Sequence, residues 1–283
     1  YIRSILNEVD VSEIRNQSPK ICVVSPSDFV ISVVVPMLTD VGCKVASFFS
    51  SNLSDIDTIV EDINKNDAAF AAFIDSNGET LILIDKRGNV IKDDFFLAFT
   101  SLITLKSEQG AKVVVPITAP LVVDTLAEKY RGQVKRTKTS PQAVMEEMLI
   151  HNLYKNRENM DQFLLNFDAL AGLVKILEYL CIHDTSLEDV AAEIPSFFTS
   201  RKDVFCPWEL KGKVMRTIIT EKGREKIELL DGVKFIFEDG WVLVIPDADS
   251  PICRVYSEGI SSKRADEISE LYVEKIKRII DNS

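Results

Sequence analysis

The sequence predicts an α/β protein in which two domains with α/β/α layers are followed by a smaller α+β domain with an antiparallel sheet. Up to about residue 200, short apolar runs alternate with amphipathic stretches, as in layered strand–helix units. From residue 201 on, closely spaced apolar runs are separated by Asp-Gly pairs, which favour hairpins. A chain of 283 residues with 46% hydrophobic content can form two or three domains. We place these domains at 1–105, 106–200 and 201–283.

The first domain is expected to follow the order strand, helix, strand, helix, strand, strand. The runs that predict these elements are 21–24, 31–41, 44–48, 56–63, 68–74 and 80–85. The last two runs flank Asp75-Ser-Asn-Gly78, a strong turn signal, so we expect a hairpin there. Asp93 and Asp94 then open a helix to about Leu105, because acidic side chains are favoured at a helix N-terminus.

The second domain is expected to begin with a strand at 111–116 and a helix at 121–130, which Gly132 ends. A strand at 133–137 follows. Ser140 and Pro141 provide an N-cap and a first helical residue for a helix to about Leu149. A helix at 167–180 has Asn166 as its expected cap. Ser186 opens a further helix through a capping-box pattern with Asp189, and Pro195 ends it.

The third domain is expected to contain a helix near 213–220, four strands and a long helix at 262–280. The strands are predicted at 226–230, 233–238, 241–245 and 252–257. Asp231-Gly232 and Asp239-Gly240 are turns of the kind that require positive φ. Together these elements predict an antiparallel sheet.

Composition excludes several classes of protein. The chain has no apolar run of about 18 residues and no signal-peptide pattern at its start, so we expect no membrane association. Its five cysteines are widely spaced in apolar contexts, which is typical of reduced thiols in a cytoplasmic protein. The net charge is −11 and no concentrated basic face is evident, which argues against nucleic acid as a partner.

Several segments resemble one family of enzymes. The segment 231–244, Asp-Gly-Val-Lys-Phe-Ile-Phe-Glu-Asp-Gly-Trp-Val-Leu-Val, precedes the loop 245–251, Ile-Pro-Asp-Ala-Asp-Ser-Pro. Gly42-Cys-Lys-Val45, Val113–Pro116 and Cys206-Pro-Trp208 extend the pattern over the whole chain. In combination these segments are similar to the second, third and fourth domains of the α-D-phosphohexomutases, which are the phosphomannomutases and phosphoglucomutases. The resemblance implies that a further domain precedes Tyr1 in the same polypeptide.

The resemblance implies a phosphate-binding loop at 245–251, where the family has R-P-S-G-T-E-P. Ile245 stands in the place of the Arg, and Asp247 and Asp249 stand in the places of the Ser and Thr. The candidate phosphate-binding residues are Asp247, Ala248, Asp249, Ser250 and Arg254. Two carboxylates repel a phosphate where two hydroxyls would bind it, so we expect a degenerate loop.

The family's metal loop, D-G-D-x-D-R, corresponds to residues 75–80. Asp75, Asn77 and Glu79 fall on its three ligand positions, and Thr80 replaces its Arg. Mg²⁺ is the implied cofactor, but one Asp, one neutral Asn and a longer Glu give at best a weak site, so we expect the metal to be lost. The alternative is that Asn77-Gly78 simply forms a hairpin turn.

The family's sugar-binding loop, G-E-x-S-G, should lie between Leu149 and Asn166, where no such sequence occurs. Glu158 is the one nearby acid that could take the place of the Glu in this loop. The alternative is that Glu158 is a solvated charge in an ordinary loop. His151 and His183 follow helices and are interpreted as helix C-terminal residues rather than catalytic groups. The basic cluster 135–138 is interpreted as a solvated strand end.

Two functions therefore stay open. In the first, the chain is a degenerate, non-catalytic mutase-like module of a sugar-phosphate or nucleotide-sugar enzyme, such as the mutase-like region that follows a nucleotidyltransferase domain. In the second, it is part of an active phosphohexomutase that interconverts hexose 1-phosphate and hexose 6-phosphate. A hexose phosphate ligand and a homo-oligomer are possible partners under either hypothesis.

Overall fold

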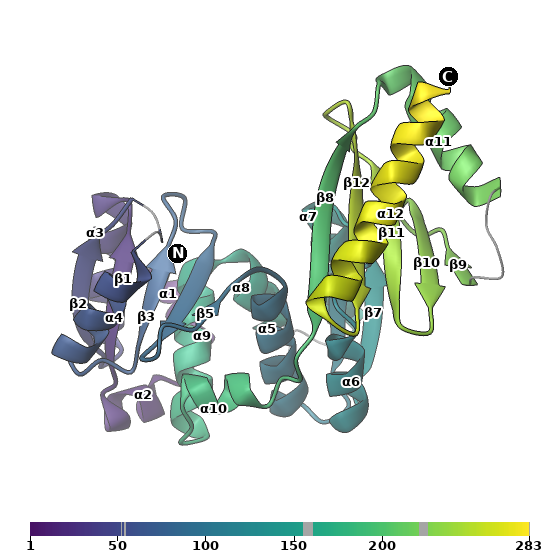
Figure 1. Ribbon diagram of the computed structural model, residues 1–283. Coiled ribbons are helices and arrows are strands. Elements are labelled where there is room, and N and C mark those ends of the chain that lie inside the picture. Colours follow the sequence, from purple (N-terminus) through teal and green to yellow (C-terminus); the bar gives the residue numbers. More distant parts are fainter. Residues whose placement is uncertain (52, 54, 155–160, 221–225, 283) are drawn as a thin grey trace. The chain divides into compact units, whose positions relative to one another are not determined.

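The computed structural model describes residues 1–51, 53, 55–154, 161–220 and 226–282 (Figure 1). The chain divides into two compact units. The first unit comprises Tyr1–Val113, Leu126–Gln133 and Met148–Ile194, and the second comprises Val114–Thr125, Val134–Glu147 and Pro195–Ser283. This division differs from the predicted boundaries at residues 105 and 200, and the organisation into three domains stays a prediction.

The first unit contains a five-stranded sheet in the order β2-β1-β3-β4-β5. Its strands are β1 (Lys20–Ser25), β2 (Lys44–Phe49), β3 (Phe70–Ile74), β4 (Leu81–Asp85) and β5 (Val90–Ile91). β1 pairs in parallel with β2 and β3, whereas β4 pairs antiparallel with β3 and β5. The predicted order and the predicted β3–β4 hairpin are confirmed. The two-residue strand β5 is too short to leave a pattern in the sequence.

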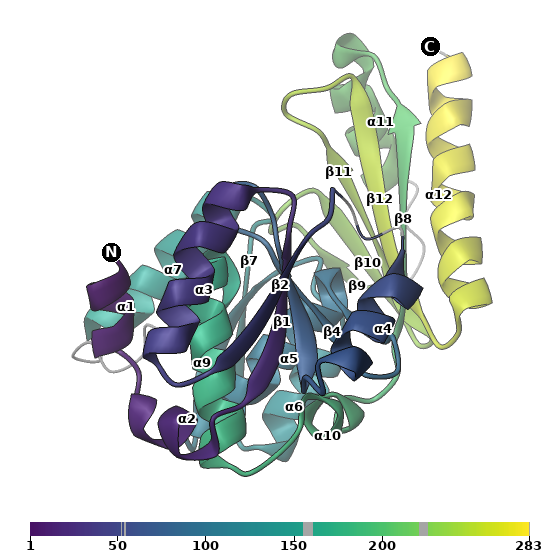
Figure 2. The same cartoon turned by 90° about the vertical axis from the view of Figure 1, so that its left-hand side faces the viewer.

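Helices cover both faces of this sheet (Figure 2). α4 (Ile56–Lys65) buries Ile59 and Ile63 against β1 and β3, and α3 (Asp28–Asp40) packs against β1 and β2. Both helices begin after an N-cap residue. The side chains of Ser27 and Asp55 accept backbone N–H groups of the first turn of α3 and α4. The sheet and these helices form the α/β layers that the sequence predicts.

The remaining helices of the first unit are α1 (Ile2–Asn7), α2 (Val11–Gln17), α5 (Asp93–Ser107), α8 (Asp161–Phe167), α9 (Ala169–Ile182) and α10 (Leu187–Ala192). The predicted cap at Asn166 is wrong. Asn166 lies inside α8, where its side chain donates to the Gln162 carbonyl at 2.7 Å. Asp168 instead caps α9 and accepts the N–H groups of Leu170 and Ala171. The predicted capping box between Ser186 and Asp189 at the start of α10 is confirmed.

A strand–helix–strand–helix segment follows the order β6 (Lys112–Pro116), α6 (Val122–Lys129), β7 (Gln133–Thr137) and α7 (Pro141–Tyr154). β6 and β7 form a two-stranded sheet. The Gln133 N–H donates to the Ala111 carbonyl and the Ile117 N–H to the Thr137 carbonyl. This order of bonds is that of a parallel pair, so α6 is a crossover helix.

The second unit contains a five-stranded sheet in the order β8-β12-β11-β10-β9. Its strands are β8 (Phe198–Phe205), β9 (Lys226–Glu228), β10 (Val233–Phe237), β11 (Gly240–Pro246) and β12 (Ile252–Gly259). All neighbours pair antiparallel, which confirms the predicted antiparallel sheet. β8 was not predicted. It is an edge strand, and the residues at its centre, Arg201–Asp203, are charged instead of apolar. β9 ends at Glu228 rather than at the predicted Leu230.

One face of this sheet is covered by α11 (Trp208–Thr220) and α12 (Ser262–Asp281). α11 begins five residues before the predicted start at Lys213. The hairpin between β10 and β11 depends on Gly240, whose φ is 155° and whose Cβ, if present, would lie 2.0 Å from the Glu258 carbonyl oxygen. Only glycine fits so close to a neighbouring strand.

The other face of the same sheet holds a buried lysine. Lys234 on β10 is 2% exposed, and its Nζ donates to the Ile117 carbonyl at 2.9 Å and lies 3.9 Å from the centre of the Trp241 ring. Burial lowers the pKa of Lys234 to about 8, and the nearby Arg136 contributes in the same direction.

The free energy of unfolding should depend on pH because the pKa of Lys234 is lowered in the folded protein. The folded protein releases the Lys234 proton at about pH 8 and the unfolded chain at about 10.5, so the unfolded state binds more protons between these values. The free energy of unfolding is therefore expected to rise through this window, by up to about 3 kcal/mol. Urea titrations from pH 7 to 10.5 should show the rise in the native chain and not in Lys234→Met. A flat profile in both proteins would contradict the expectation.

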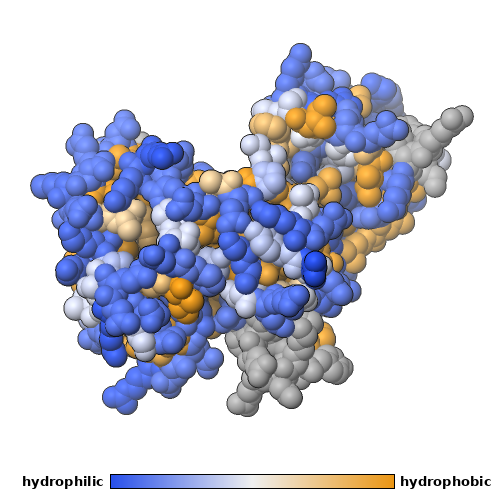
Figure 3. All heavy atoms as spheres, turned by 90° about the horizontal axis from the view of Figure 1, so that it is seen from below, coloured by the Kyte–Doolittle hydropathy of each residue, from blue (hydrophilic) through white to orange (hydrophobic). Residues whose placement is uncertain are grey.

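The hydropathy of the surface and the state of the cysteines can be compared with what the composition predicts. Hydrophilic residues cover most of the face shown in Figure 3. Within the described ranges no helix is both long enough and apolar enough to cross a bilayer. All five cysteines are free and buried, as predicted.

Candidate functional site

The predicted metal loop is a closed hairpin turn between β3 and β4. Oδ1 of Asp75 accepts the N–H groups of Glu79 and Thr80 at 2.9 and 3.0 Å. The Asp75 N–H donates to the Thr80 carbonyl at 3.2 Å, and the Gly78 N–H donates to the Asp75 carbonyl at 3.2 Å. Gly78 has a φ of 75°, which a side chain would strain. The turn therefore uses Asp75 to bind its own backbone.

The donor set of this loop does not fit Mg²⁺. The side chains of Asn77 and Glu79 are exposed, and one oxygen of Asp75 already binds two N–H groups. Across the part of the chain that the structure describes, no group of three or more His, Cys, Asp or Glu side chains could hold a metal ion. Mg²⁺ requires several oxygen ligands in octahedral geometry, and this turn does not offer them. Loss of the metal itself stays a prediction.

A second turn in the same sheet shows the same use of a carboxylate. Asp85, at the end of β4, accepts the N–H groups of Arg87 and Asn89 at 2.8 Å each, and the Asn89 amide at 2.7 Å. Asp85 is 4% exposed, and among the described residues it belongs to no group of His, Cys, Asp or Glu side chains that could hold a metal ion. The geometry at Asp75 is thus the geometry of a structural turn residue.

Replacing Asp75 by Ala should destabilise the protein by about 1–2 kcal/mol, because two backbone N–H groups lose their acceptor. The loss is expected to be the same with and without millimolar Mg²⁺, as measured by urea unfolding. Asp75→Asn is the matched control, since it keeps an acceptor oxygen while removing the charge, and it should recover most of the loss. A destabilisation that appears only in the presence of Mg²⁺ would instead identify Asp75 as a metal ligand.

The predicted phosphate loop connects β11 to β12 and also binds itself. Oδ1 of Asp247 accepts the N–H groups of Asp249 and Ser250 at 2.9 and 2.7 Å. The other carboxylate oxygen pairs with the Arg254 guanidinium. The bond from the Asp249 N–H is the largest of the contacts that lower the pKa of Asp247. The carboxylate is therefore ionised at neutral pH.

Lys211, on α11, forms hydrogen bonds to the backbone of this loop. Nζ of Lys211 donates to the carbonyls of Asp247 and Ser250 at 2.6 Å each, and lies 3.6 Å from the centre of the Trp208 ring. Binding both carbonyls fixes the loop peptides while the N–H groups of residues 249 and 250 bind the Asp247 carboxylate. Neighbouring N–H groups of this kind can bind an anion, and here the anion is a side chain of the same loop.

The candidate residues are thus partly brought together. Asp247, Ser250 and Arg254 meet in one loop, whereas the side chains of Ala248 and Asp249 are exposed. Arg254 binds Asp247, a contact that no pattern in the sequence indicated. Asp75, Asn77 and Glu79 belong to the first unit, and the 247–251 loop belongs to the second.

The expected sugar-binding segment is described in part. Glu158 and the side chain of His151 lie outside the described residues. His183 follows α9; its Nδ1 is 2.9 Å from the Tyr179 carbonyl and its ring stacks on the Tyr179 ring, which confirms a helix C-terminal residue. The interpretation of 135–138 as a solvated strand end is wrong for Arg136, which binds the Ala119 carbonyl at 2.7 Å and pairs with Asp124.

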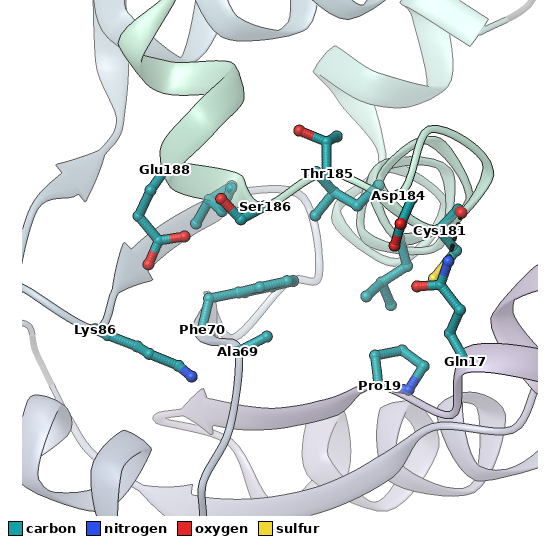
Figure 4. Close-up of a pocket in the computed structure, with 13 residues that line it drawn as sticks. Gln17, Pro19, Ala69, Phe70, Lys86, Cys181, Asp184, Thr185, Ser186 and Glu188 are labelled. Carbon is teal, nitrogen blue, oxygen red and sulfur yellow. Dashed lines mark hydrogen bonds between the residues drawn. The ribbon is translucent and has the colours of Figure 1, made fainter.

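The first unit also contains a cavity of about 420 Å³ that no sequence pattern indicated. Figure 4 shows Lys86 and Glu188 on one side of this cavity and Gln17 and Asp184 on the other. Nε2 of Gln17 donates to the Cys181 carbonyl at 2.7 Å, and the Ser186 hydroxyl caps α10. Gln17 and Ser186 therefore have partners within the protein, and the residues that line the cavity are far apart in the sequence.

Comparisons with known proteins show that the chain is similar to mutases. No protein-family model matches the chain. A phosphoglucomutase/phosphomannomutase of Thermococcus kodakarensis is 27% identical over 299 residues, which cover 99% of this chain and 65% of that protein. A phosphoglucosamine mutase of Methanocaldococcus jannaschii is 26% identical over 310 residues, which cover 99% of this chain and 67% of that protein. The chain thus spans 65% of the length of the first of these relatives.

Solved structures share the fold. A phosphoglucomutase/phosphomannomutase family protein of Burkholderia thailandensis has a TM-score of 0.78 at 14% identity, with 99% of this chain and 64% of that one covered. An N-acetylglucosamine-phosphate mutase of the α-D-phosphohexomutase superfamily has a TM-score of 0.61 at 13% identity, with 96% and 64% covered. The predicted resemblance is confirmed at this level: the homologues and structural neighbours of the chain are phosphoglucomutases, phosphomannomutases and phosphoglucosamine mutases.

Proposed function

We propose that this chain is a phosphohexomutase-like region that does not transfer phosphate and serves as a non-catalytic module of a sugar-phosphate or nucleotide-sugar enzyme. The observation that carries the proposal is the carboxylate of Asp247, which accepts the loop N–H groups of residues 249 and 250 at 2.9 and 2.7 Å. A substrate phosphate would need those same donors.

Charge supports the same conclusion. Ile245 offers no donor where a bidentate Arg would bind two phosphate oxygens. Asp247 and Asp249 add about two negative charges beside a phosphate that is itself almost a dianion. At a few ångströms, and at the dielectric of a protein surface, each such repulsion costs several kcal/mol. Arg254 pairs with Asp247 and so offsets one of the two carboxylate charges but not both.

The second support is the hairpin at Asp75. Phosphoryl transfer relies on a metal ion that stabilises the charge on the moving group. Here the first ligand position binds backbone N–H groups, and the second carries a neutral Asn77. A module with neither a metal site nor a phosphate site keeps the fold of the mutases without their chemistry.

The alternative function is an active phosphohexomutase that interconverts hexose 1-phosphate and hexose 6-phosphate. The names of the relatives favour it, since one is a phosphoglucomutase/phosphomannomutase and another a phosphoglucosamine mutase. The relatives are also longer, so a whole protein could supply groups that this chain does not contain. This alternative requires a phosphate to displace Asp247 from its own loop.

The place of the module in the cell is part of the proposal. A nucleotidyltransferase domain in the same polypeptide, a cytoplasmic location and self-association into a homo-oligomer would suit a non-catalytic region of a nucleotide-sugar enzyme. A hexose phosphate could bind outside the 245–251 loop as a regulatory ligand. Neither nucleic acid nor a membrane is proposed as a partner, because the net charge is −11.

Binding and activity assays test the proposal directly. Calorimetry with Mg²⁺, glucose 6-phosphate and mannose 6-phosphate at millimolar concentration should show no saturable heat that depends on residues 75–79 or 245–251. No mutase activity is expected, even when a first mutase domain bearing a phosphoserine is supplied in trans. Micromolar Mg²⁺ binding that disappears in Asp75→Ala, or micromolar binding of either sugar phosphate through the 245–251 loop, would overturn the proposal.

Reversal of the loop is the sharper test. The triple variant Ile245→Arg, Asp247→Ser, Asp249→Thr frees the N–H groups of the loop and restores three donors, so measurable affinity for mannose phosphate is expected. Calorimetry with mannose 6-phosphate measures it.

The matched control is Ile260→Arg, Asp266→Ser, Asp281→Thr, which changes the net charge by the same amount at exposed positions elsewhere in the second unit. Binding by the control as strong as that of the reversed loop would show a general charge effect. The absence of binding in a folded triple variant would show that the loop backbone no longer suits a phosphate.

A further inference from the structure

The second unit contains a buried charged cluster that the proposed function does not use. Lys234, Trp241 and Glu258 lie on three adjacent strands, on the sheet face opposite α11 and α12. Their exposed fractions are 2%, 1% and 7%. A lysine and a glutamate are rarely so buried unless they are paired and hydrogen-bonded, so the cluster requires an explanation.

The cluster forms hydrogen bonds to both ends of one short segment, Ile117–Leu121. Oε2 of Glu258 accepts the Leu121 N–H at 2.9 Å and the Trp241 indole N–H at 2.7 Å. Nζ of Lys234 donates to the Ile117 carbonyl at 2.9 Å while lying over the Trp241 ring. The segment Ile117–Leu121 leads from β6 into α6, so the cluster binds the chain directly before α6.

Other contacts orient the same region. Ile117 packs against Trp241 and Leu243 in a small apolar cluster on this face. Oδ2 of Asp231, in the turn before β10, accepts the Thr139 N–H at 2.8 Å and its hydroxyl at 2.5 Å, just before α7. The C-terminal sheet therefore provides acceptors close to the N-termini of two helices that follow β6 and β7.

Hydrogen bonds from buried charged groups are suited to holding a segment in one position. Burial raises the pKa of Glu258, although the Leu121 and Trp241 donors oppose the rise. Lys234 and Glu258 carry opposite charges in one buried cluster, and such an arrangement is often no more stable than apolar residues of the same shape, because both charged groups lose their hydration. Its best-attested use is to fix one register or orientation. An apolar contact of Ile117 with the sheet could slide, whereas hydrogen bonds at residues 117 and 121 cannot.

We propose that Lys234, Trp241 and Glu258 form a latch that fixes the segment Ile117–Leu121 and the start of α6 in one position on the C-terminal sheet. The latch lowers the free energy of unfolding compared with an apolar contact of the same shape, and it restricts local opening of the segment. It does not depend on whether the chain binds sugar phosphates, so it goes beyond the proposed function.

Amide hydrogen exchange in the full chain tests the latch. Glu258→Ala removes the acceptor of the Leu121 N–H, and exchange at Leu121 should become at least about tenfold faster, while amides inside the β10–β11 ladder keep their protection. Asp239→Ala is the matched control, because it removes another carboxylate of the same unit, which pairs with Arg264. Unchanged exchange at Leu121 in folded Glu258→Ala would overturn the proposal.

A double-mutant cycle decides the matter even if Glu258→Ala fails to fold. Lys234→Met and Glu258→Met should each lower the urea midpoint, because each removes a hydrogen bond to the segment and leaves the opposite charge buried without the charge that attracts it. The combined variant should recover at least half of the summed loss while Leu121 exchanges faster than in the native chain. Losses that simply add, or unchanged Leu121 exchange in the combined variant, would overturn the latch.

Discussion

A carboxylate that accepts backbone N–H groups is the interaction on which the loops of this protein depend. Asp75 and Asp85 close the two turns of the first sheet in this way, and Asp247 closes the loop between β11 and β12. Each takes up donors that would otherwise be open to water or to a ligand. The same interaction also joins separate elements, since Glu258 accepts the N–H at the start of α6.

This use of carboxylates bears directly on function. A loop that presents N–H groups in a concave arrangement binds an anion, and a covalently attached carboxylate is always present at high effective concentration. Asp247 therefore competes with any phosphate in solution, with Arg254 and Lys211 holding the arrangement from two sides. The homology to mutases and the altered loops are compatible, because a fold persists through its core while chemistry depends on a few exposed loop residues.

Much of the fold could be predicted because the apolar periodicity is local. The β3–β4 hairpin and the capping box of α10 follow from residues that are neighbours in the sequence. Prediction failed where an element is polar or very short. The edge strand β8 carries charged residues at its centre, and Asn166 has the chemistry of a cap but lies within α8, with Asp168 two residues further on.

The sequence by itself determined which side chains stand at positions 75, 77, 79, 245, 247 and 249, and hence which donors and charges the two candidate loops can offer. Only the tertiary structure decided what those side chains bind. The pairing of Asp247 with Arg254, and that of Arg136 with Asp124, depend on strand register and on chain geometry that no local pattern encodes. The burial of Lys234 and Glu258 depends on a segment more than a hundred residues away. A sequence pattern predicts that a charged residue in a strand faces solvent, and only contacts with distant segments can show that it is buried.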